Sequence, residues 1–269
     1  MQYADTHVHL DQQEFAADRE TVIQRSRKAG VEIMVCAGTS ADSSRAALSL
    51  AQAHTVIYAA VGIQPNHCAE AGPGDWDRIV EMAEQPKVVA LGETGLDRHW
   101  DFAPLELQCV YLDRHLRLAQ RSNLPVILHC REAAAELLPL LREAASRGPL
   151  RGVLHAFSGN AGMAAECLEL GLYVSFAGPV TYTNRKFRPL REVAQTIPDD
   201  RLLIETDSPY LVPHPLRGQQ KRNEPAYVAC IAECLAELRG TSVQRLSAQT
   251  MENARQLFRL GGDVDLGGF

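Results

Sequence analysis

Eight short apolar runs rich in β-branched residues recur along the 269-residue chain, and longer amphipathic stretches separate them. The runs lie at residues 2–8, 31–36, 56–61, 87–92, 125–129, 151–155, 172–176 and 201–205. Helical patterns include residues 18–29, 41–53, 104–122, 132–146 and 161–170, and two more at 225–239 and 242–258 follow the last run. Strands that alternate with helices pair in parallel through βαβ crossovers, and near-continuous apolar character is typical of strands buried on both faces.

An open doubly wound sheet and a closed barrel both accommodate this alternation. Eight units, and the lack of a G-x-G-x-x-G motif after the first run, favour closure, and about 250 residues is a typical length for one such barrel. We therefore predict an α/β chain with a single (β/α)8 TIM barrel over residues 1–260 and a Gly-rich C-terminal tail over residues 261–269.

Charge and cysteine content narrow the class of protein. Lys and Arg number 27 against 33 Asp and Glu, a net charge of −6, which argues against coating long nucleic acids but not against gripping one phosphate through metal ions. The seven cysteines form no C-x-x-C pair, which is typical of reduced thiols in the cytoplasm. No apolar run approaches the roughly 18 residues of a membrane span. We expect a cytoplasmic protein that does not bind membranes, with a monomer favoured.

Histidines and acids gather where the predicted strands end, which is the catalytic end of barrel enzymes. His7 and His9 close the first run, and side chains two apart on a strand point to the same face. Four other residues of this kind lie at the ends of later runs: Glu93, His129 and His155 close the fourth, fifth and sixth runs, and Asp207 follows the eighth.

Each of these residues alone is a weak signal. An isolated histidine at a strand end is more often a hydrogen-bonded core residue, and an acid there is usually a turn or helix cap. Burying four imidazoles and two carboxylates together, however, is costly unless a cation compensates their charge. The combination predicts a metal site made by His7, His9, Glu93, His129, His155 and Asp207.

This ligand set suits Zn²⁺, Mn²⁺, Mg²⁺ or Ni²⁺, and the identity of the metal stays open. One ion takes three or four protein ligands, so six predict two divalent ions with Glu93 as the bridging carboxylate. Two such ions clamp a phosphoryl substrate and acidify a shared water. We assign Asp207 and Glu93 as catalytic, with Asp207 as the general base; whether Asp207 also ligates is left open.

Seven motifs, in order along the whole chain, resemble those of the TatD family of metal-dependent deoxyribonucleases. They are D-T-H-V-H-L-D, V-G-I-Q-P-N, L-G-E-T-G-L-D, L-H-C-R-E, H-A-F-S-G, E-T-D-S-P-Y-L and K-R-N-E-P-A-Y-V. The resemblance implies a TIM barrel and metal-dependent hydrolysis of DNA phosphodiesters, often as a 3′→5′ exonuclease. It also implies that the six residues above occupy the metal-binding positions of the family.

One motif departs from the family, which usually carries His before the Pro of the third run, where this chain has Gln64. His67 is a candidate replacement for a phosphate contact, or a plain loop histidine. Arg131 is a candidate for bidentate phosphate binding, with an internal ion pair as the alternative. Asn223 either touches substrate or caps the following helix.

Side chains around the expected mouth of the barrel are weaker candidates for substrate contacts. Cations in two late loops would attract a DNA end, or are simply solvated: Arg185, Lys186, Arg188, Arg217, Lys221 and Arg222. Three aromatic residues are candidates for stacking on a terminal base, with core packing as the alternative: Phe157, Tyr182 and Tyr210.

The sequence thus predicts a metal-dependent phosphodiesterase, a deoxyribonuclease of 3′–5′ exonuclease type that hydrolyses single-stranded DNA or DNA ends through a metal-activated water. The alternative is a metal-dependent amidohydrolase or esterase acting on a small molecule or aminoacyl-tRNA, and a non-catalytic metal- or nucleic-acid-binding protein is a further rival. Many amidohydrolase barrels bridge two metals with a carbamylated lysine on the fourth strand. Here Lys87 starts the fourth run, at the wrong end of the barrel, which favours the nuclease.

Overall fold

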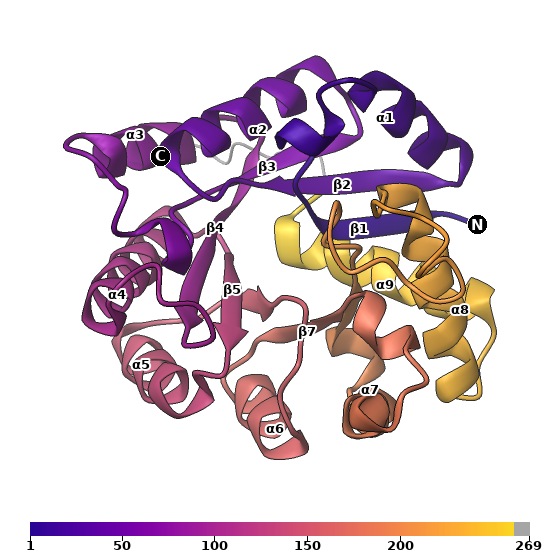
Figure 1. Cartoon of the computed structure of the whole chain (residues 1–269). Helices are drawn as coiled ribbons and strands as arrows, with labels where there is room; N and C mark the ends of the chain where they lie inside the picture. The colour runs from indigo at the N-terminus through magenta and orange to yellow at the C-terminus, as the bar shows by residue number, and fades with distance from the viewer. Residues whose placement is uncertain (261–269) are drawn as a thin grey trace, which may run out of the picture.

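The computed structural model describes residues 1–260, so the predicted tail at 261–269 lies outside the described residues. One sheet of eight parallel strands, in sequential order, forms the centre of the molecule (Figure 1). The strands are β1 Tyr3–Val8, β2 Val31–Ala37, β3 Ile57–Val61, β4 Val88–Asp97, β5 Val126–Arg131, β6 Gly152–Leu154, β7 Tyr173–Phe176 and β8 Leu202–Ile204. This arrangement confirms the predicted (β/α)8 barrel.

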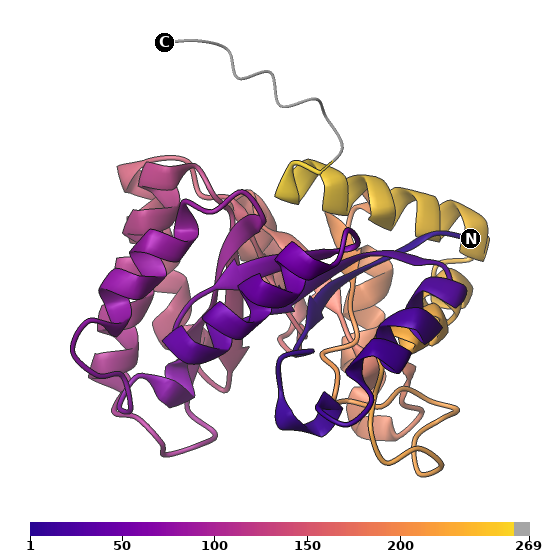
Figure 2. The same cartoon turned by 90° about the horizontal axis from the view of Figure 1, so that it is seen from above.

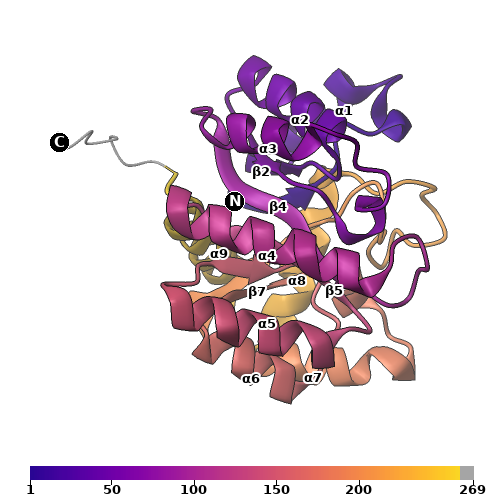
Figure 3. The same cartoon turned by 90° about the vertical axis from the view of Figure 1, so that its left-hand side faces the viewer.

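Helices surround the sheet (Figures 1 and 3). They are α1 Arg19–Lys28, α2 Ala41–Ala53, α3 Asp75–Ala83, α4 Leu105–Ser122, α5 Ala134–Arg147, α6 Ala161–Glu169, α7 Arg188–Thr196, α8 Val228–Leu238 and α9 Val243–Phe258. Short 3-10 helices are η1 Gln13–Phe15, η2 Pro65–His67, η3 Gly178–Thr181, η4 Arg185–Phe187, η5 Asp199–Arg201 and η6 Pro225–Tyr227. Within residues 1–260, no helix is both long and apolar enough to cross a lipid bilayer.

The first and last strands approach each other at their carboxyl ends. Val8 and Ser208 form a parallel bridge. The His9 amide donates to the Ser208 carbonyl at 2.8 Å, and the Asp207 amide donates to the His7 carbonyl at 2.9 Å. The backbone bonds that close the barrel therefore also fix the positions of two histidines and an aspartate from opposite ends of the chain.

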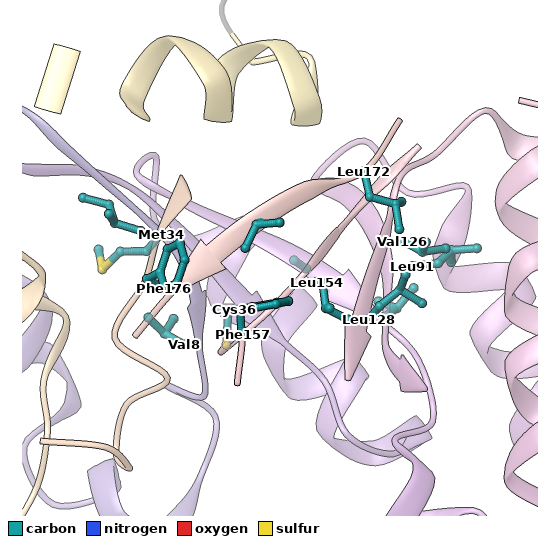
Figure 4. Packing of buried hydrophobic residues seen from close by; sticks show 14 of the residues in the cluster. Val8, Met34, Cys36, Leu91, Val126, Leu128, Leu154, Phe157, Leu172 and Phe176 are labelled. Atoms are coloured by element: carbon teal, nitrogen blue, oxygen red, sulfur yellow. The ribbon is translucent and has the colours of Figure 1, made fainter. Parts of the chain in front are cut away.

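Two hydrophobic layers hold the barrel together. The larger lies between strands and outer helices and includes Leu128, Leu154 and Phe176 (Figure 4). The smaller fills the barrel interior and includes Phe258 of α9, which lies across one end of the barrel (Figure 2). Asn253 of α9 donates to the Leu202 carbonyl at the start of β8 at 2.8 Å, so α9 covers the amino ends of the strands. The carboxyl ends are left for the polar site.

The fourth strand is longer than predicted. The predicted run ends at residue 92, whereas β4 extends to Asp97 and contains Glu93 rather than ending before it. Residues 94–97 pair with residues 128–131 of β5. The sequence hides this extension because Gly, Glu and Asp are disfavoured in strands, and here burial and pairing override that preference.

Candidate metal centre

Two histidines, one on β1 and one directly after it, lie close to the same carboxylate oxygen of Glu93. His7 lies on β1 and His9 directly after Val8, and their Nε2 atoms are 3.1 Å apart, as the H-x-H spacing predicts. Glu93 Oε2 lies 3.3 Å from His7 Nε2 and 3.7 Å from His9 Nε2. We call His7, His9 and Glu93 Oε2 the β1 half-site.

Two further histidines meet the other oxygen of the same carboxylate. His129 on β5 places Nδ1 2.9 Å from Glu93 Oε1, and His155, directly after β6, places Nε2 3.1 Å from it. We call His129, His155 and Glu93 Oε1 the β5–β6 half-site. The buried Glu93 therefore lies between two imidazole pairs and presents one oxygen to each.

Asp207 completes the cluster from the segment after β8. Its Oδ1 lies 3.4 Å from His9 Nε2 and 3.7 Å from His7 Nε2. Its backbone is in the left-handed region, with φ 55°, a conformation that costs free energy and that aspartate tolerates better than most residues. The Asp207 side chain is 13% exposed against 2% for Glu93, so Asp207 is the acid of the pair that solvent reaches.

Hydrogen bonds behind the imidazoles decide which ring nitrogen faces the cluster. His9 donates from Nδ1 to the Ala37 carbonyl at 2.8 Å, so Nε2 is the ring nitrogen that faces the cluster. His129 donates from Nε2 to Asp97 Oδ2 at 3.0 Å, so its Nδ1 faces Glu93. A carboxylate or carbonyl on the outer nitrogen is the usual support of a metal-binding histidine.

The charges of the cluster depend on one another. Burial works to raise the pKa of Glu93, but the charge of His155 and the contacts of Glu93 with the histidines hold this pKa well below its usual value. Burial works to lower the pKa of His9, but Asp207 and then Glu93 raise this pKa to about 9. Burial likewise works to raise the pKa of Asp97, but its bond from His129 lowers this pKa to about 2. The carboxylates of the cluster are thus held ionised, whereas burial lowers the pKa of His7.

The residues present fit divalent cations. His7 Nδ1 and Glu93 Oε2 are buried and have no hydrogen-bond partner among the described residues, so Glu93 Oε2 has an acceptor lone pair to offer. Ligand-capable atoms lie within 4.8 Å of one another in three overlapping groups: His7, His155 and Asp207; His7, His9 and Glu93; Glu93, His129 and His155. Imidazole nitrogens with carboxylate oxygens are donors that several divalent first-row metals accept.

A glycine lets β4 approach β5 closely enough to build this cluster. Gly95 has φ +144°, and a Cβ atom there would lie 2.0 Å from the His129 carbonyl oxygen. A side chain at this position would push apart the two strands that carry Glu93 and His129. The G-E-T-G segment therefore provides the candidate ligand Glu93 and also the small residue that close packing of β4 on β5 requires.

The three residues predicted to contact substrate differ in exposure and in their hydrogen-bond partners. Arg131 ends β5, is exposed, and forms none of the ion pairs found in residues 1–260. His67 lies on η2, and its Nδ1 is 3.0 Å from Glu70 Oε2, with no hydrogen bond to the cluster among the described residues. Asn223 is fully buried, and its side chain donates to the Thr206 carbonyl and accepts from the Glu224 amide. These bonds use the polar atoms of Asn223 inside the fold, and the expectation that Asn223 touches substrate stays a prediction.

Ion pairs neutralise part of the positive charge of the two late loops. Arg222 pairs with Asp18 at 2.8 Å and with Glu224 at 3.0 Å. Arg188 begins α7 instead of lying in a loop, and pairs with Glu192 at 2.8 Å. These ion pairs offset the charge of both arginines within the protein, and the expectation that the cations of the two loops attract DNA stays a prediction.

Two of the three predicted stacking residues are core residues. Phe157 is 3% exposed and Tyr182 7% exposed. The ring of Phe157 packs against Phe176, and the ring of Tyr182 packs against Phe187. Tyr210 is 47% exposed, and its ring centroid lies 6.1 Å from that of His9. Only Tyr210 keeps the accessible face that base stacking requires.

Three residues near the centre were not selected from the sequence. Asp97 and Glu205 are buried carboxylates behind His129 and His155, with Glu205 Oε1 3.4 Å from His155 Nδ1. Both lie inside motifs already noted, but nothing in their spacing shows which histidine they support. Gln64 Nε2 donates to Glu93 Oε1 at 3.3 Å, so the residue that departs from the family pattern reaches the cluster itself.

Comparison with models of known protein families identifies the family of this chain. The model of the family described as TatD-related DNase matches residues 4–259 of the chain. The chain belongs to the TatD family. The motif resemblance found in the sequence is thereby confirmed.

Individual TatD relatives match over almost their whole length. The chain is 41% identical over 256 residues to the uncharacterized metal-dependent hydrolase YabD of Bacillus subtilis (strain 168), covering 95% of this chain and 98% of that protein. It is 39% identical over 259 residues to the protein named 3′-5′ ssDNA/RNA exonuclease TatD of Erwinia tasmaniensis, covering 95% and 99%. The crystal structure of YJJV, a TatD homologue from Escherichia coli K12, superposes with a TM-score of 0.89 at 32% identity, covering 96% and 98%.

Proposed function

We propose that this TatD-family chain is a metal-dependent deoxyribonuclease that removes nucleotides from the 3′ end of single-stranded or frayed DNA. One observation carries the proposal: Glu93 presents one oxygen to each of two imidazole pairs. A shared carboxylate between two nitrogen pairs is the arrangement expected of a two-cation phosphodiesterase. The relatives named 3′-5′ ssDNA/RNA exonucleases support a single-stranded nucleic acid as the substrate, and the family described as TatD-related DNase supports DNA.

The ligands divide between two ions. His7, His9 and Glu93 would hold one, and Glu93, His129 and His155 would hold the other, with Asp207 beside the first. Divalent cations in such a cage acidify water and neutralise the negative charge that grows on the phosphoryl oxygens. Mg²⁺, Mn²⁺ and Zn²⁺ are all compatible with these donors.

Asp207 is the proposed general base. Its carboxylate is the more exposed acid of the cluster, and its pKa is held below the usual value: burial works to raise it, and the contact with His9 and then the charge of His7 lower it. An ionised carboxylate at this position accepts a proton from water as its oxygen forms a bond to phosphorus. The bond from phosphorus to the 3′ oxygen breaks, that oxygen takes a proton from solvent, and a 5′-mononucleotide leaves.

The chain offers a cation for the strand that remains bound. Arg131 is exposed at the end of β5, next but one to His129, and is not consumed by an ion pair within the described residues. A guanidinium binds two phosphate oxygens at once, so Arg131 is the proposed phosphate contact near the scissile bond. His67 and Tyr210 are further proposed contacts with the DNA strand.

The test is cleavage by metal-stripped protein to which single ions are returned. A 5′-labelled single-stranded oligonucleotide should shorten from its 3′ end when Mg²⁺, Mn²⁺ or Zn²⁺ is added, and stay intact without metal. Amide, lactone and aminoacyl ester substrates are assayed in parallel. Turnover of one of these with an intact oligonucleotide would replace the nuclease by a small-molecule hydrolase or an esterase.

A further inference from the structure

An exposed aromatic pair lies in the β4–α4 loop, residues 98–104, directly after the strand that carries Glu93. Trp100 is 47% exposed and Phe102 is 62% exposed, among the most exposed large apolar side chains of residues 1–260. Their rings are stacked, with centroids 5.6 Å apart and planes 22° apart. Exposed apolar rings cost free energy in water, so a stacked pair held at the surface points to a binding role. We call Trp100 and Phe102 the aromatic platform.

The platform is attached to the metal centre through one carboxylate. Asp97 Oδ1 accepts hydrogen bonds from the His99 amide at 2.8 Å and the Trp100 amide at 3.1 Å. Asp97 Oδ2 accepts from His129 Nε2 at 3.0 Å. The same side chain therefore fixes an imidazole of the β5–β6 half-site and the start of the platform loop.

A positive charge accompanies the rings. The Arg131 guanidinium lies 5.7 Å from the centroid of the Trp100 ring. It lines a surface groove with Arg98, Ser158 and Gly159. The carboxylates of this groove have partners already, Glu132 with His99 Nδ1 at 2.8 Å and Glu136 with Arg98. Among the described residues of the groove, Arg131 is thus the charge left for an anion.

We propose that the aromatic platform stacks on an unpaired nucleobase of the DNA strand while Arg131 holds a neighbouring phosphate; this inference rests on the proposed nuclease function. Stacking on exposed rings beside a cation is how proteins bind single strands without reading sequence. A duplex hides the faces of its bases, so the platform selects single-stranded or frayed ends. The platform should bind a strand that carries bases more tightly than an abasic strand, whatever the identity of the bases.

Binding is measured by tryptophan fluorescence. The chain has two tryptophans, and Trp76 packs against Tyr111 and His115, so a Trp76→Phe variant leaves Trp100 as the only reporter. The probe is phosphorothioate-linked oligo(dT), which slows cleavage by the metal-loaded full chain. We expect saturable quenching, and binding about 5- to 150-fold weaker, without quenching, for an abasic strand of equal length. Equal binding of both strands with no quenching overturns the proposal.

Kinetics separate the platform from the metal centre. In the double variant Trp100→Ala/Phe102→Ala, kcat/KM for oligo(dT) should fall about 5- to 150-fold, mainly through KM. Hydrolysis of methyl p-nitrophenyl phosphate, a diester without a nucleobase, should not change. Trp100→Phe should restore most of the loss, and Val110→Ala, which removes an exposed apolar side chain of α4, should have no effect.

The outcomes distinguish the two proposals. If metal-loaded wild-type protein cleaves neither diester, the nuclease function fails and this inference fails with it. If the wild type cleaves both and the double variant does so equally well, only the platform fails. The platform is also overturned if the double variant abolishes concentration-dependent self-association in sedimentation while cleavage of oligo(dT) is unchanged, because the rings would then be a contact between copies.

Discussion

The two half-sites that share Glu93 differ in what lies behind their imidazoles. In the β5–β6 half-site, His129 donates to Asp97 at 3.0 Å, and the outer nitrogen of His155 is 3.4 Å from Glu205. In the β1 half-site, His9 donates to a backbone carbonyl. Neither His7 Nδ1 nor His155 Nδ1 has a hydrogen-bond partner among the described residues, so the nearby Glu205 carboxylate is what sets His155 apart from His7. A carboxylate behind a histidine raises its basicity as a ligand more than a neutral carbonyl does. We therefore propose that the β5–β6 half-site binds its cation more tightly than the β1 half-site, whose ion would exchange more readily.

The largest effect is expected from the residue that both half-sites share. Glu93→Gln leaves the side-chain volume but removes the charge that both oxygens provide, so cleavage should fall by about 10³-fold or more. Metal content after dialysis should fall at both half-sites. Retention of two ions per chain by this variant would contradict the bridging role of Glu93.

A large loss of turnover without loss of metal is expected from the proposed base. Asp207→Asn should lower kcat by about 10²- to 10⁴-fold, because a proton acceptor is lost while four imidazoles and Glu93 stay in place. Elemental analysis checks that the ions remain bound. If kcat stays near the wild-type value, the proton goes to another group.

The acids behind the imidazoles provide the sharpest test of the difference between the half-sites. Asp97→Asn should weaken the tighter ion by about 10- to 100-fold and bring its affinity toward that of the β1 half-site. Stepwise Zn²⁺ titration followed by calorimetry measures both affinities. Asp11→Asn is the matched control, since Asp11 accepts from Ser43 at 2.7 Å rather than from an imidazole. Equal shifts in both affinities for Asp97→Asn would remove the distinction.

The smallest effect is expected at Gln64. Its amide donates to the Glu93 oxygen that faces β5–β6, so Gln64→Ala should change the affinity of that half-site by about 2- to 10-fold. The β1 half-site should be unaffected, because its histidines contact the other oxygen. The same calorimetric titration decides this, and a change confined to the β1 half-site would be inconsistent with the hydrogen bond.

Much of the fold and the centre of the site follow from local rules. Alternating runs and helices predict the barrel because strands linked by helices must pair in parallel. The H-x-H spacing brings His7 and His9 together because alternate strand residues share a face. The carboxyl ends of parallel strands meet at one edge, which explains why Glu93, His129 and His155 converge although 62 residues separate the first from the last.

The features of the site that could not be predicted from the sequence depend on burial and on pairing between residues far apart in the chain. Asn223 carries a polar side chain in a known motif, yet its donors and acceptors are consumed inside the protein. Phe157 and Trp100 are both aromatic and close to the mouth, but only the structure shows that the first is buried and the second exposed. The pairing of Asp97 with His129 joins residues of neighbouring strands through side chains, and no periodicity records it.

The most direct test of the shared cage is a crystal structure of the Mn²⁺-loaded protein with anomalous diffraction. We predict two peaks about 3.5–4 Å apart, one beside His7 and His9 and the other beside His129 and His155, with the Glu93 carboxylate between them. The peak at β5–β6 should persist at the lower Mn²⁺ concentration. A single peak, or two peaks with Glu93 bound to only one of them, would contradict the account.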